Sequence, residues 1–270
     1  MRRLLHITDI HFGRDHQPDR SEGILRLARK RRPDVVVVSG DVTKRAKPSQ
    51  FQEARRFVDA LGAPAVVVPG NHDVPLFRVW ERALLPFGAY KRHFDAELEP
   101  VWQDDELLII GVNTAHGWTF TGGRVRPRQI ERVRRRLEEE AGRRFTIVVQ
   151  HHQMIPVPAY GKDEVFRRAR TMARTLAMAG ADLVLSGHVH LSYLGDSSGA
   201  DAAAVPAVPV LFSGTASSSR GRGPEKGRNS LHWLEIEDET VAVERLEWQV
   251  DKGGFETTGT RVLTRRRRGA

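Results

Sequence analysis

The sequence has no cysteine and no long apolar run. Without cysteine there is no disulfide framework, and any metal site has to use His, Asp or Asn as ligands. No apolar stretch approaches the roughly 20 residues that a membrane-spanning helix needs. The first apolar stretch, Leu4–Ile7, follows a basic pair but meets Asp9 at once, so it predicts a buried strand and not a signal peptide. These absences favour a cytoplasmic protein.

Basic residues are in excess, with 43 Lys and Arg against 34 Asp and Glu and a formal net charge of +9. An excess of positive charge favours anionic substrates and phosphate-bearing partners. Part of the excess is the terminal run Arg265–Arg268, which gives two partner hypotheses: weak contact with nucleic acid, or with an anionic membrane. We therefore predict one domain over residues 1–250 and a flexible basic tail over residues 251–270.

Strand-like apolar runs alternate with amphipathic stretches through most of the sequence, and the region after residue 190 is rich in short strands. This order indicates an α/β fold of two packed sheets covered by helices. The predicted strands are Leu4–Ile7, Asp34–Ser39, Ala65–Val68, Leu107–Val112, Phe145–Val149, Asp182–Leu185, Val208–Phe212, Leu231–Ile236 and Val241–Trp248, and the predicted helices are Glu22–Arg31, Pro48–Leu61, Arg78–Phe94 (broken at Pro86 and Gly88), Pro127–Ala141 and Asp163–Ala179.

Five of the predicted strands are followed by side chains suited to metal binding. In the segments 9–11 (DIH) and 188–190 (HVH), two polar residues are separated by one, so on an extended strand end both point to the same face. Gly40 lets the backbone turn sharply and directs the carboxylate of Asp41 to the carboxyl edge of its strand.

Two further segments complete the set. The tight turn Gly70–Asp73 offers an amide oxygen, an imidazole and a carboxylate, and His151 follows the strand that ends at Val149. His152 points to the opposite side of an extended chain, so we expect it to support the site without binding metal. Each segment alone has an ordinary explanation, such as a helix cap at Asp41. Together they predict a dinuclear metal site.

The mixture of side chains suits two divalent cations about 3.5–4 Å apart. Such a pair needs a bridging carboxylate, for which Asp41 is the natural candidate, and an open bridging position for water. The metals lower the pKa of that water toward neutrality and so create a hydroxide nucleophile. Oxygen and imidazole ligands without thiolate suit Mn, Fe, Zn or Co.

The ordered segments DIH, GD, GNHD, HH and GHVH, between residues 9 and 190, resemble the calcineurin-like metallophosphoesterase superfamily. The resemblance implies a four-layer αββα sandwich, with two mixed β-sheets flanked by helices and the metal site at the carboxyl ends of the strands. It implies one metal held by Asp9, His11, Asp41 and His190, a second held by Asp41, Asn71, His151 and His188, a substrate phosphoryl group contacted by Asn71 and His72, and an Asp73 that orients His72 for catalysis.

The motifs of this chain differ from those of several branches of the superfamily, which limits the resemblance to fewer branches. Protein Ser/Thr phosphatases have an Arg soon after the second aspartate, in GDxxDRG, and then GNHE, whereas this chain has GDVTKR and GNHD. Purple acid phosphatases have a metal-binding Tyr where this chain has Lys44. Lipid A pathway pyrophosphatases and repair exonucleases usually show HG in place of the pair His151-His152. The HH pair, the GDVT segment and SGTASSSR (213–220) are most similar to bacterial class III cyclic-nucleotide phosphodiesterases, although the usual HHxP is altered here, with proline only at Pro156.

The leading hypothesis is a metal-dependent phosphodiesterase that hydrolyses small phosphodiesters by attack of a metal-bridging hydroxide. The resemblance suggests 3′,5′-cyclic AMP as the substrate. A nuclease or broad-specificity phosphoesterase is the alternative, favoured by the basic balance. A third hypothesis is a nucleic-acid or membrane binding protein stabilised by metal, whose site would be closed. Substrate discrimination is expected in loops 12–20 and 116–124, where His116 is a candidate substrate contact. A homodimer is a further partner hypothesis.

Overall fold

The computed structural model describes residues 1–118, 120–140, 142–160 and 164–265. Its strands are β1 Arg2–Ile7, β2 Val35–Val38, β3 Ala65–Val67, β4 Val101–Gln103, β5 Leu107–Val112, β6 Phe145–Gln150, β7 Leu183–Ser186, β8 Tyr193–Asp196, β9 Pro209–Phe212, β10 Ser230–Ile236, β11 Thr240–Gln249 and β12 Gly254–Thr264. Its α-helices are α1 Pro18–Arg31, α2 Pro48–Ala60, α3 Val79–Leu84, α4 Gly88–His93, α5 Pro127–Glu140 and α6 Ala169–Ala179, and its 3₁₀ helices are η1 Asn71–Asp73, η2 Pro158–Tyr160, η3 Ser197–Gly199 and η4 Gly223–Glu225.

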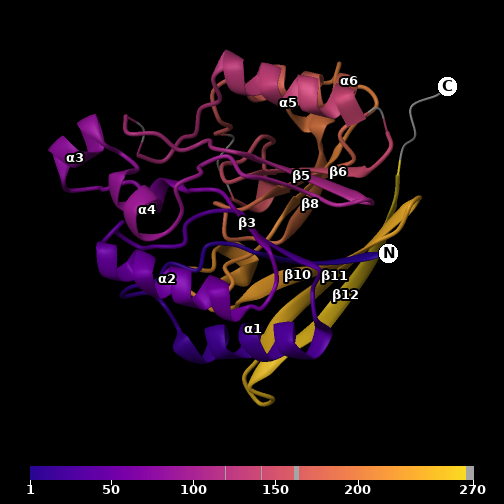
Figure 1. The fold of residues 1–270 in the computed structure, drawn as a ribbon. Helices are drawn as coiled ribbons and strands as arrows, with labels where there is room; N and C mark the ends of the chain where they lie inside the picture. Colours follow the sequence, from indigo (N-terminus) through magenta and orange to yellow (C-terminus); the bar gives the residue numbers. More distant parts are fainter. Residues whose placement is uncertain (119, 141, 161–163, 266–270) are drawn as a thin grey trace.

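The strands form two six-stranded mixed sheets with helices on both outer faces. One sheet has the order β12-β11-β10-β1-β2-β3 and the other the order β4-β5-β6-β7-β9-β8. Figure 1 shows α1 and α2 on one side of the molecule and α5 and α6 on the opposite side, with the strands between them. The predicted αββα sandwich is confirmed.

Alternation of side chains along the central strands produces three apolar layers. In β2, Val35 and Val37 pack between the two sheets, while Val36 and Val38 pack beneath α1 and α2. Strand β6 repeats this alternation between the layer inside the sandwich and the layer under α5 and α6. A strand that is buried on both faces needs an unbroken apolar run, which explains why the sequence of β2 is VVVV.

Several element boundaries differ from the sequence-based expectation. Helix α1 begins at Pro18, because proline is well suited to the first turn of a helix, where the backbone N–H has no partner to lose. The broken helix expected between Arg78 and Phe94 is two short helices, α3 and α4. Helix α6 begins at Ala169, after Arg168 in a left-handed conformation, and Asp163, its predicted start, lies outside the described residues.

The predicted boundary at residue 250 has to be revised. Strand β12 pairs with β11 from Gly254 to Thr264, so these residues belong to the first sheet and do not form a flexible tail. Most side chains of β12 are exposed, so its sequence lacks the apolar alternation that predicts a strand. Arg265 is also fixed: its Nε donates to Asp182 Oδ1 at 3.2 Å, and its side chain is 7% exposed.

Three sequence-based expectations remain open after the fold is known. The arginines 266–268, and with them the proposed nucleic-acid or membrane contact, lie outside the described residues. Among the helices that the structure describes, none is both long and apolar enough to cross a membrane. The cytoplasmic location and the homodimer stay predictions.

Candidate metal centre

The carboxyl ends of strands from both sheets meet at one edge of the sandwich, and the seven predicted metal ligands come together there. They are Asp9 and His11 after β1, Asp41 after β2, Asn71 in η1 after β3, His151 after β6, and His188 and His190 after β7. Glycine permits this close approach of the sheets. A Cβ on Gly40 would lie 2.5 Å from the ring of His151, and a Cβ on Gly187 would collide with the hydroxyl of Thr8.

Five of the seven ligand positions have left-handed backbone conformations that non-glycine residues seldom adopt. The φ angles are 52° at Asp9, 54° at His11, 52° at Asp41, 72° at His188 and 57° at His190. Each such residue costs on the order of 1–3 kcal/mol and persists only where its surroundings hold it. The expectation of extended strand ends is therefore wrong for both His-containing pairs, although their side chains do converge.

The first cluster consists of Asp9, His11, Asp41 and His190, all buried. Asp9 Oδ1 lies 3.0 Å from His190 Nε2 and 3.5 Å from His11 Nε2, and Asp41 Oδ2 lies 3.7 Å from the same nitrogen of His11. The Nδ1 atoms of both imidazoles donate to backbone carbonyls, at 3.4 Å for His11 and 2.8 Å for His190. Each Nε2 lone pair is thereby left facing the carboxylates, as in a metal ligand.

The second cluster shares Asp41 and adds Asn71, His151 and His188. His151 Nε2 lies 3.4 Å from Asp41 Oδ2 and 3.3 Å from Asn71 Oδ1, and His188 Nδ1 lies 3.2 Å from that amide oxygen. Asn71 Nδ2 donates to the carbonyl of Phe120 at 3.2 Å, which directs Oδ1 toward the imidazoles. Asp41 Oδ2 is therefore the atom that both clusters have in common.

This donor set fits two cations. Asp9 Oδ1 is buried and has no hydrogen-bond partner among the described residues, a costly state for a carboxylate oxygen that a bound cation would relieve. The Nε2 atoms of His11 and His190 face each other at 3.4 Å, although their other nitrogens already carry the ring protons. Oxygen and imidazole donors without thiolate match Mn, Fe, Zn or Co.

His151 differs in charge from two other imidazoles of the site, His11 and His188. Burial lowers the pKa of His11 and of His188 to about 3, so both are neutral at pH 7, as metal ligands must be. Burial also opposes protonation of His151, but the Asp41 carboxylate raises the pKa of His151 to about 9. A cation that binds there has to displace a proton.

His152 lies behind the second cluster. Its Nδ1 is 2.8 Å from the hydroxyl of Thr114, and its ring centroid is 4.7 Å from that of His188. One of its nitrogens comes within 4.8 Å of ligand atoms of His151 and His188. Asn71 is the better ligand because its oxygen lies at hydrogen-bond distance from both of those imidazoles, so the supporting role of His152 stays a prediction.

His72 stands beside the two clusters and belongs to neither. Its Nδ1 donates to the carbonyl of Lys44 at 3.0 Å, and its Nε2 lies 3.0 Å from Nη1 of Arg220. The same Nη1 lies 3.1 Å from His11 Nε2. A cationic, fork-shaped side chain is thus held over the site, in a position to meet an anionic substrate.

Asp73 does not orient His72, and that prediction is wrong. The Asp73 carboxylate accepts hydrogen bonds from the backbone of Gly70 (2.9 Å) and from the backbone and hydroxyl of Thr43 (2.8 and 2.9 Å). Burial and the charge of Asp41 raise the pKa of Asp73 to about 7. The side chain braces the turn of η1 against the loop after β2, and the carbonyl of Lys44 orients His72 instead.

A cavity of about 490 Å³ lies over the clusters. Its lining combines four basic side chains (Lys44, Arg45, Arg220 and Arg222) with apolar and aromatic ones (Val74, Leu76, Phe120 and Tyr160), besides Asp41, Asn71, His72, His188, His190 and Thr121. Such walls suit an anion that is attached to an organic group. The metal-type motifs of the sequence do not identify Arg220, Arg222 and Tyr160 as site residues, although Arg220 ends the SGTASSSR segment that is part of the family resemblance.

The loop that carries Arg220 is fastened to the first cluster. The hydroxyl of Thr215 donates to the carbonyl of Asp9 at 2.7 Å, and the backbone N–H of Ala216 donates to the carbonyl of Thr8 at 3.0 Å. The carbonyl of Arg220 accepts the proton of His190 Nδ1. A Gly/Ser/Arg-rich stretch that looks like an ordinary surface loop in the sequence is therefore part of the site.

His116 does not line the cavity over the clusters, so its predicted contact with substrate there is not supported by the geometry. It lines a neighbouring cavity together with Trp118 and Arg124. The loop turns away because Gly117 packs against helix α3, where a Cβ would collide with the carbonyl of Arg82. Phe120, two residues beyond Trp118, returns the chain to the metal centre.

Comparison with known proteins agrees with this geometry. The family model described as calcineurin-like phosphoesterase matches residues 2–192. Among curated proteins, a probable cyclic nucleotide phosphodiesterase of Synechococcus is 24% identical, covering 87% of this chain and 93% of its own length. A cAMP/cGMP dual specificity phosphodiesterase of Mycobacterium tuberculosis is 28% identical, covering 96% of this chain and 82% of its own length.

Solved structures show the same fold at low sequence identity. A dimetal phosphatase from Danio rerio superposes with a TM-score of 0.69 at 9% identity, covering 98% of this chain and 99% of its own. A purple acid phosphatase from yellow lupin superposes with a TM-score of 0.72 at 11% identity, covering 97% of this chain and 53% of its own.

Proposed function

We propose that this chain, which belongs to the calcineurin-like phosphoesterase family and is therefore a metal-dependent phosphoesterase, acts on a 3′,5′-cyclic nucleotide. Cyclic AMP is the first candidate. The observation that carries the proposal is the cavity over the two clusters, whose volume of about 490 Å³ suits a mononucleotide and whose walls are basic and aromatic. The names of the Synechococcus and mycobacterial relatives support the same substrate class.

Seven residues are proposed as the metal ligands, in the two clusters that share Asp41. Two divalent cations (Mn, Fe, Zn or Co) held there would supply the Lewis acidity and the activation of water that phosphoester hydrolysis needs. The strained backbone at five of these positions fixes the side chains before a cation arrives, so little rearrangement is needed on binding.

Arg220 is proposed as the residue that binds the substrate phosphate. Its Nη1 contacts the neutral imidazoles of His11 and His72, and its Nε lies 3.7 Å from the carboxylate of Asp15. A cation held by His11 would take the lone pair that Arg220 contacts, and a phosphodiester anion then offers the guanidinium charged oxygens, a stronger interaction than with a neutral nitrogen. Lys44, which pairs with the same Asp15, adds a second positive charge to this wall.

His72 is proposed to contact the phosphoryl group or the leaving oxygen. Its ring is fixed by the carbonyl of Lys44 through Nδ1, so Nε2 has to take up a proton, once Arg220 has turned to the substrate, before it can donate to an oxygen. The nucleoside would lie between Phe120 and Tyr160, the two aromatic residues of the cavity lining other than histidine. Phe120 is itself stacked on the guanidinium of Arg82 at 4.3 Å, so this ring has a fixed position.

The test is a substrate panel assayed with protein that has been stripped of metal and reloaded with Mn²⁺. The panel contains cyclic AMP, cyclic GMP, AMP, a bis(nitrophenyl) phosphate and a short single-stranded oligonucleotide. We expect the highest kcat/KM for the cyclic nucleotides and no turnover by Asp41→Asn. A higher kcat/KM for the oligonucleotide would make the protein a nuclease, the second candidate, which the half-buried basic residues Arg45 and Arg222 in the cavity wall favour.

A further inference from the structure

A second cavity, of about 460 Å³, lies beside the metal centre. Helix α4, the loop 96–99, the loop 113–118 and the start of α5 enclose it. No proposed metal ligand lines this cavity. The two cavities are neighbours, because Trp118 lines this one and Phe120, two residues further along the chain, lines the other. Its volume is close to that of the metal-site cavity and is large enough for a mononucleotide.

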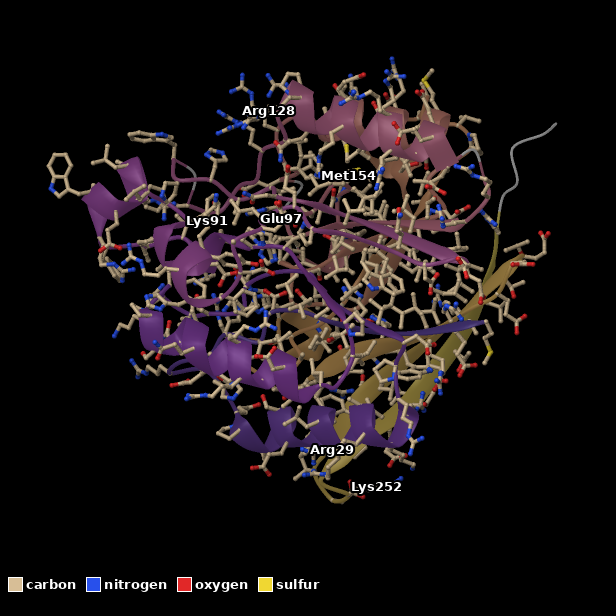
Figure 2. The ribbon with its side chains drawn as sticks, in the orientation of Figure 1. Arg29, Lys91, Glu97, Arg128, Met154 and Lys252 are labelled. Atoms are coloured by element: carbon tan, nitrogen blue, oxygen red, sulfur yellow. The ribbon has the colours of Figure 1, made fainter. Side chains whose placement is uncertain are left out.

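Four cationic side chains line the second cavity: Lys91, Arg124, Arg126 and Arg128. In the part of the chain that the structure describes, none of the four has an ion-pair partner. Figure 2 shows Arg128, at the start of α5, above Lys91 on α4. Unpaired cations around one hollow concentrate positive potential inside it.

Two carboxylates line the cavity, and both already bind other groups of the protein. Glu97 accepts hydrogen bonds from the backbone N–H groups of residues 98 and 99, at 2.8 Å each. Glu99 pairs with Arg132 at 3.3 Å and accepts a hydrogen bond from the backbone of Asn113 at 3.1 Å. The acidic groups therefore hold the loop in shape, while the basic groups remain available for a ligand.

The backbone explains why these arginines converge. Val125 is completely buried, so in the extended segment 124–126 the side chains of Arg124 and Arg126 share the opposite face. Arg128 follows Pro127 in the first turn of α5, where the aligned peptide dipoles of a 14-residue helix add partial positive charge. Sequence and fold thus bring three guanidinium groups into the lining of one cavity.

A donor and two aromatic rings complete the lining. Nδ1 of His116 accepts a hydrogen bond from the backbone of Trp118 at 3.4 Å, so Nε2 carries the ring proton. That buried N–H has no acceptor among the described residues. Phe87 and Trp118 also line the cavity, and the Trp118 side chain is 79% exposed. A large exposed ring beside unpaired cations suits a flat aromatic group joined to an anion.

We propose that this cavity binds a nucleoside monophosphate, with the phosphate on Arg124 and Arg128 and the base against Trp118. Guanidinium groups suit a phosphate because their paired N–H donors match its oxygens, and a dianionic monoester benefits most from several of them. The site is distinct from the metal centre, and its existence does not depend on which phosphodiester the metal centre hydrolyses.

The test is equilibrium dialysis of the metal-loaded protein against radiolabelled AMP, with the variant Arg124→Gln/Arg128→Gln. The control, Arg135→Gln/Arg228→Gln, removes two arginines whose side chains are 65% and 61% exposed and which lie elsewhere on the surface. We expect the cavity variant to lose one AMP per chain, or to bind it at least about tenfold more weakly, while the control matches the wild type. Equal AMP binding by both variants and the wild type would overturn the proposal.

Competition experiments show which part of AMP the second cavity recognises. They are applied to the AMP binding that the wild type has and the cavity variant lacks. Ribose 5-phosphate, inorganic phosphate and adenosine are each added at the concentration of AMP. We expect AMP to bind more tightly than ribose 5-phosphate, and both to bind more tightly than phosphate or adenosine. Displacement by inorganic phosphate as effective as that by AMP would show that the base contributes nothing. Equally effective displacement by adenosine would show that the arginines contribute nothing, and either result contradicts the nucleotide assignment.

Discussion

The two halves of the metal centre differ in charge. The first cluster contains two carboxylates, Asp9 and Asp41, and two imidazoles, whereas the second has only the shared Asp41 together with an amide and two imidazoles. A cation is held more strongly where more negative charge surrounds it. We therefore expect the first cluster to bind a cation more tightly than the second, and variants of the two halves to behave differently.

The largest effect is expected from Asp41→Asn, because this substitution damages both halves. The side chain keeps its shape but loses the charge that lies within 3.7 Å of His11 and 3.4 Å of His151. Several kcal/mol of charge stabilisation are lost, so activity should fall by roughly 10³-fold or more. Elemental analysis should find fewer than two metals per chain. Two tightly bound metals in this variant would refute the bridging role.

Asp9→Asn and Asn71→Ala separate the halves. Asp9→Asn removes a charge from the first cluster only, and Asn71→Ala removes an oxygen that lies 3.3 Å from His151 and 3.2 Å from His188 in the second. In a Mn²⁺ titration, Asp9→Asn should lose the tighter binding event and Asn71→Ala the weaker one. Asn113→Ala, which changes an asparagine outside both clusters, is the matched control and should retain both. Identical titrations for the first two variants would remove the distinction between the halves.

His72→Ala should leave metal binding by both clusters unchanged, because the side chain lies outside them. Both metals should remain, and kcat should fall by about 10²–10⁴, the usual contribution of a positioned proton donor or charge-stabilising group. A nitrophenyl ester and an ester with a poor leaving group distinguish the two roles. A greater loss with the poor leaving group assigns proton donation to His72, and equal losses assign charge stabilisation.

Arg220→Gln is expected to have the smallest effect of this series. Loss of the guanidinium near His11 and His72 should raise KM by about tenfold, while both metals stay bound, because Arg220 contacts the ligands without being one. Arg228→Gln, in the same loop but at the surface with its side chain 61% exposed, is the matched control. A loss of metal in Arg220→Gln would mean that the arginine supports the clusters instead of the substrate.

The sequence predicted most of the fold because the central strands are buried on both faces, and VVVV in β2 has no other ordinary explanation in a chain of this kind. Strand β12 was not predicted, because its exposed residues have no apolar pattern. Asp9, Asp41 and His151 could be found from the sequence because each directly follows such a buried strand. Arg220 could not be assigned a role, because its position depends on contacts between residues distant in the sequence, such as the hydrogen bond from Thr215 to the carbonyl of Asp9.

Electron paramagnetic resonance of the Mn²⁺-loaded protein tests the central claim most directly, because two Mn²⁺ ions that share Asp41 must interact magnetically. We predict the spectrum of an exchange-coupled pair at two Mn²⁺ per chain, and the six-line spectrum of an isolated ion in Asn71→Ala at one Mn²⁺ per chain. An isolated-ion spectrum in the wild type at full loading would contradict the account of two clusters joined by one carboxylate.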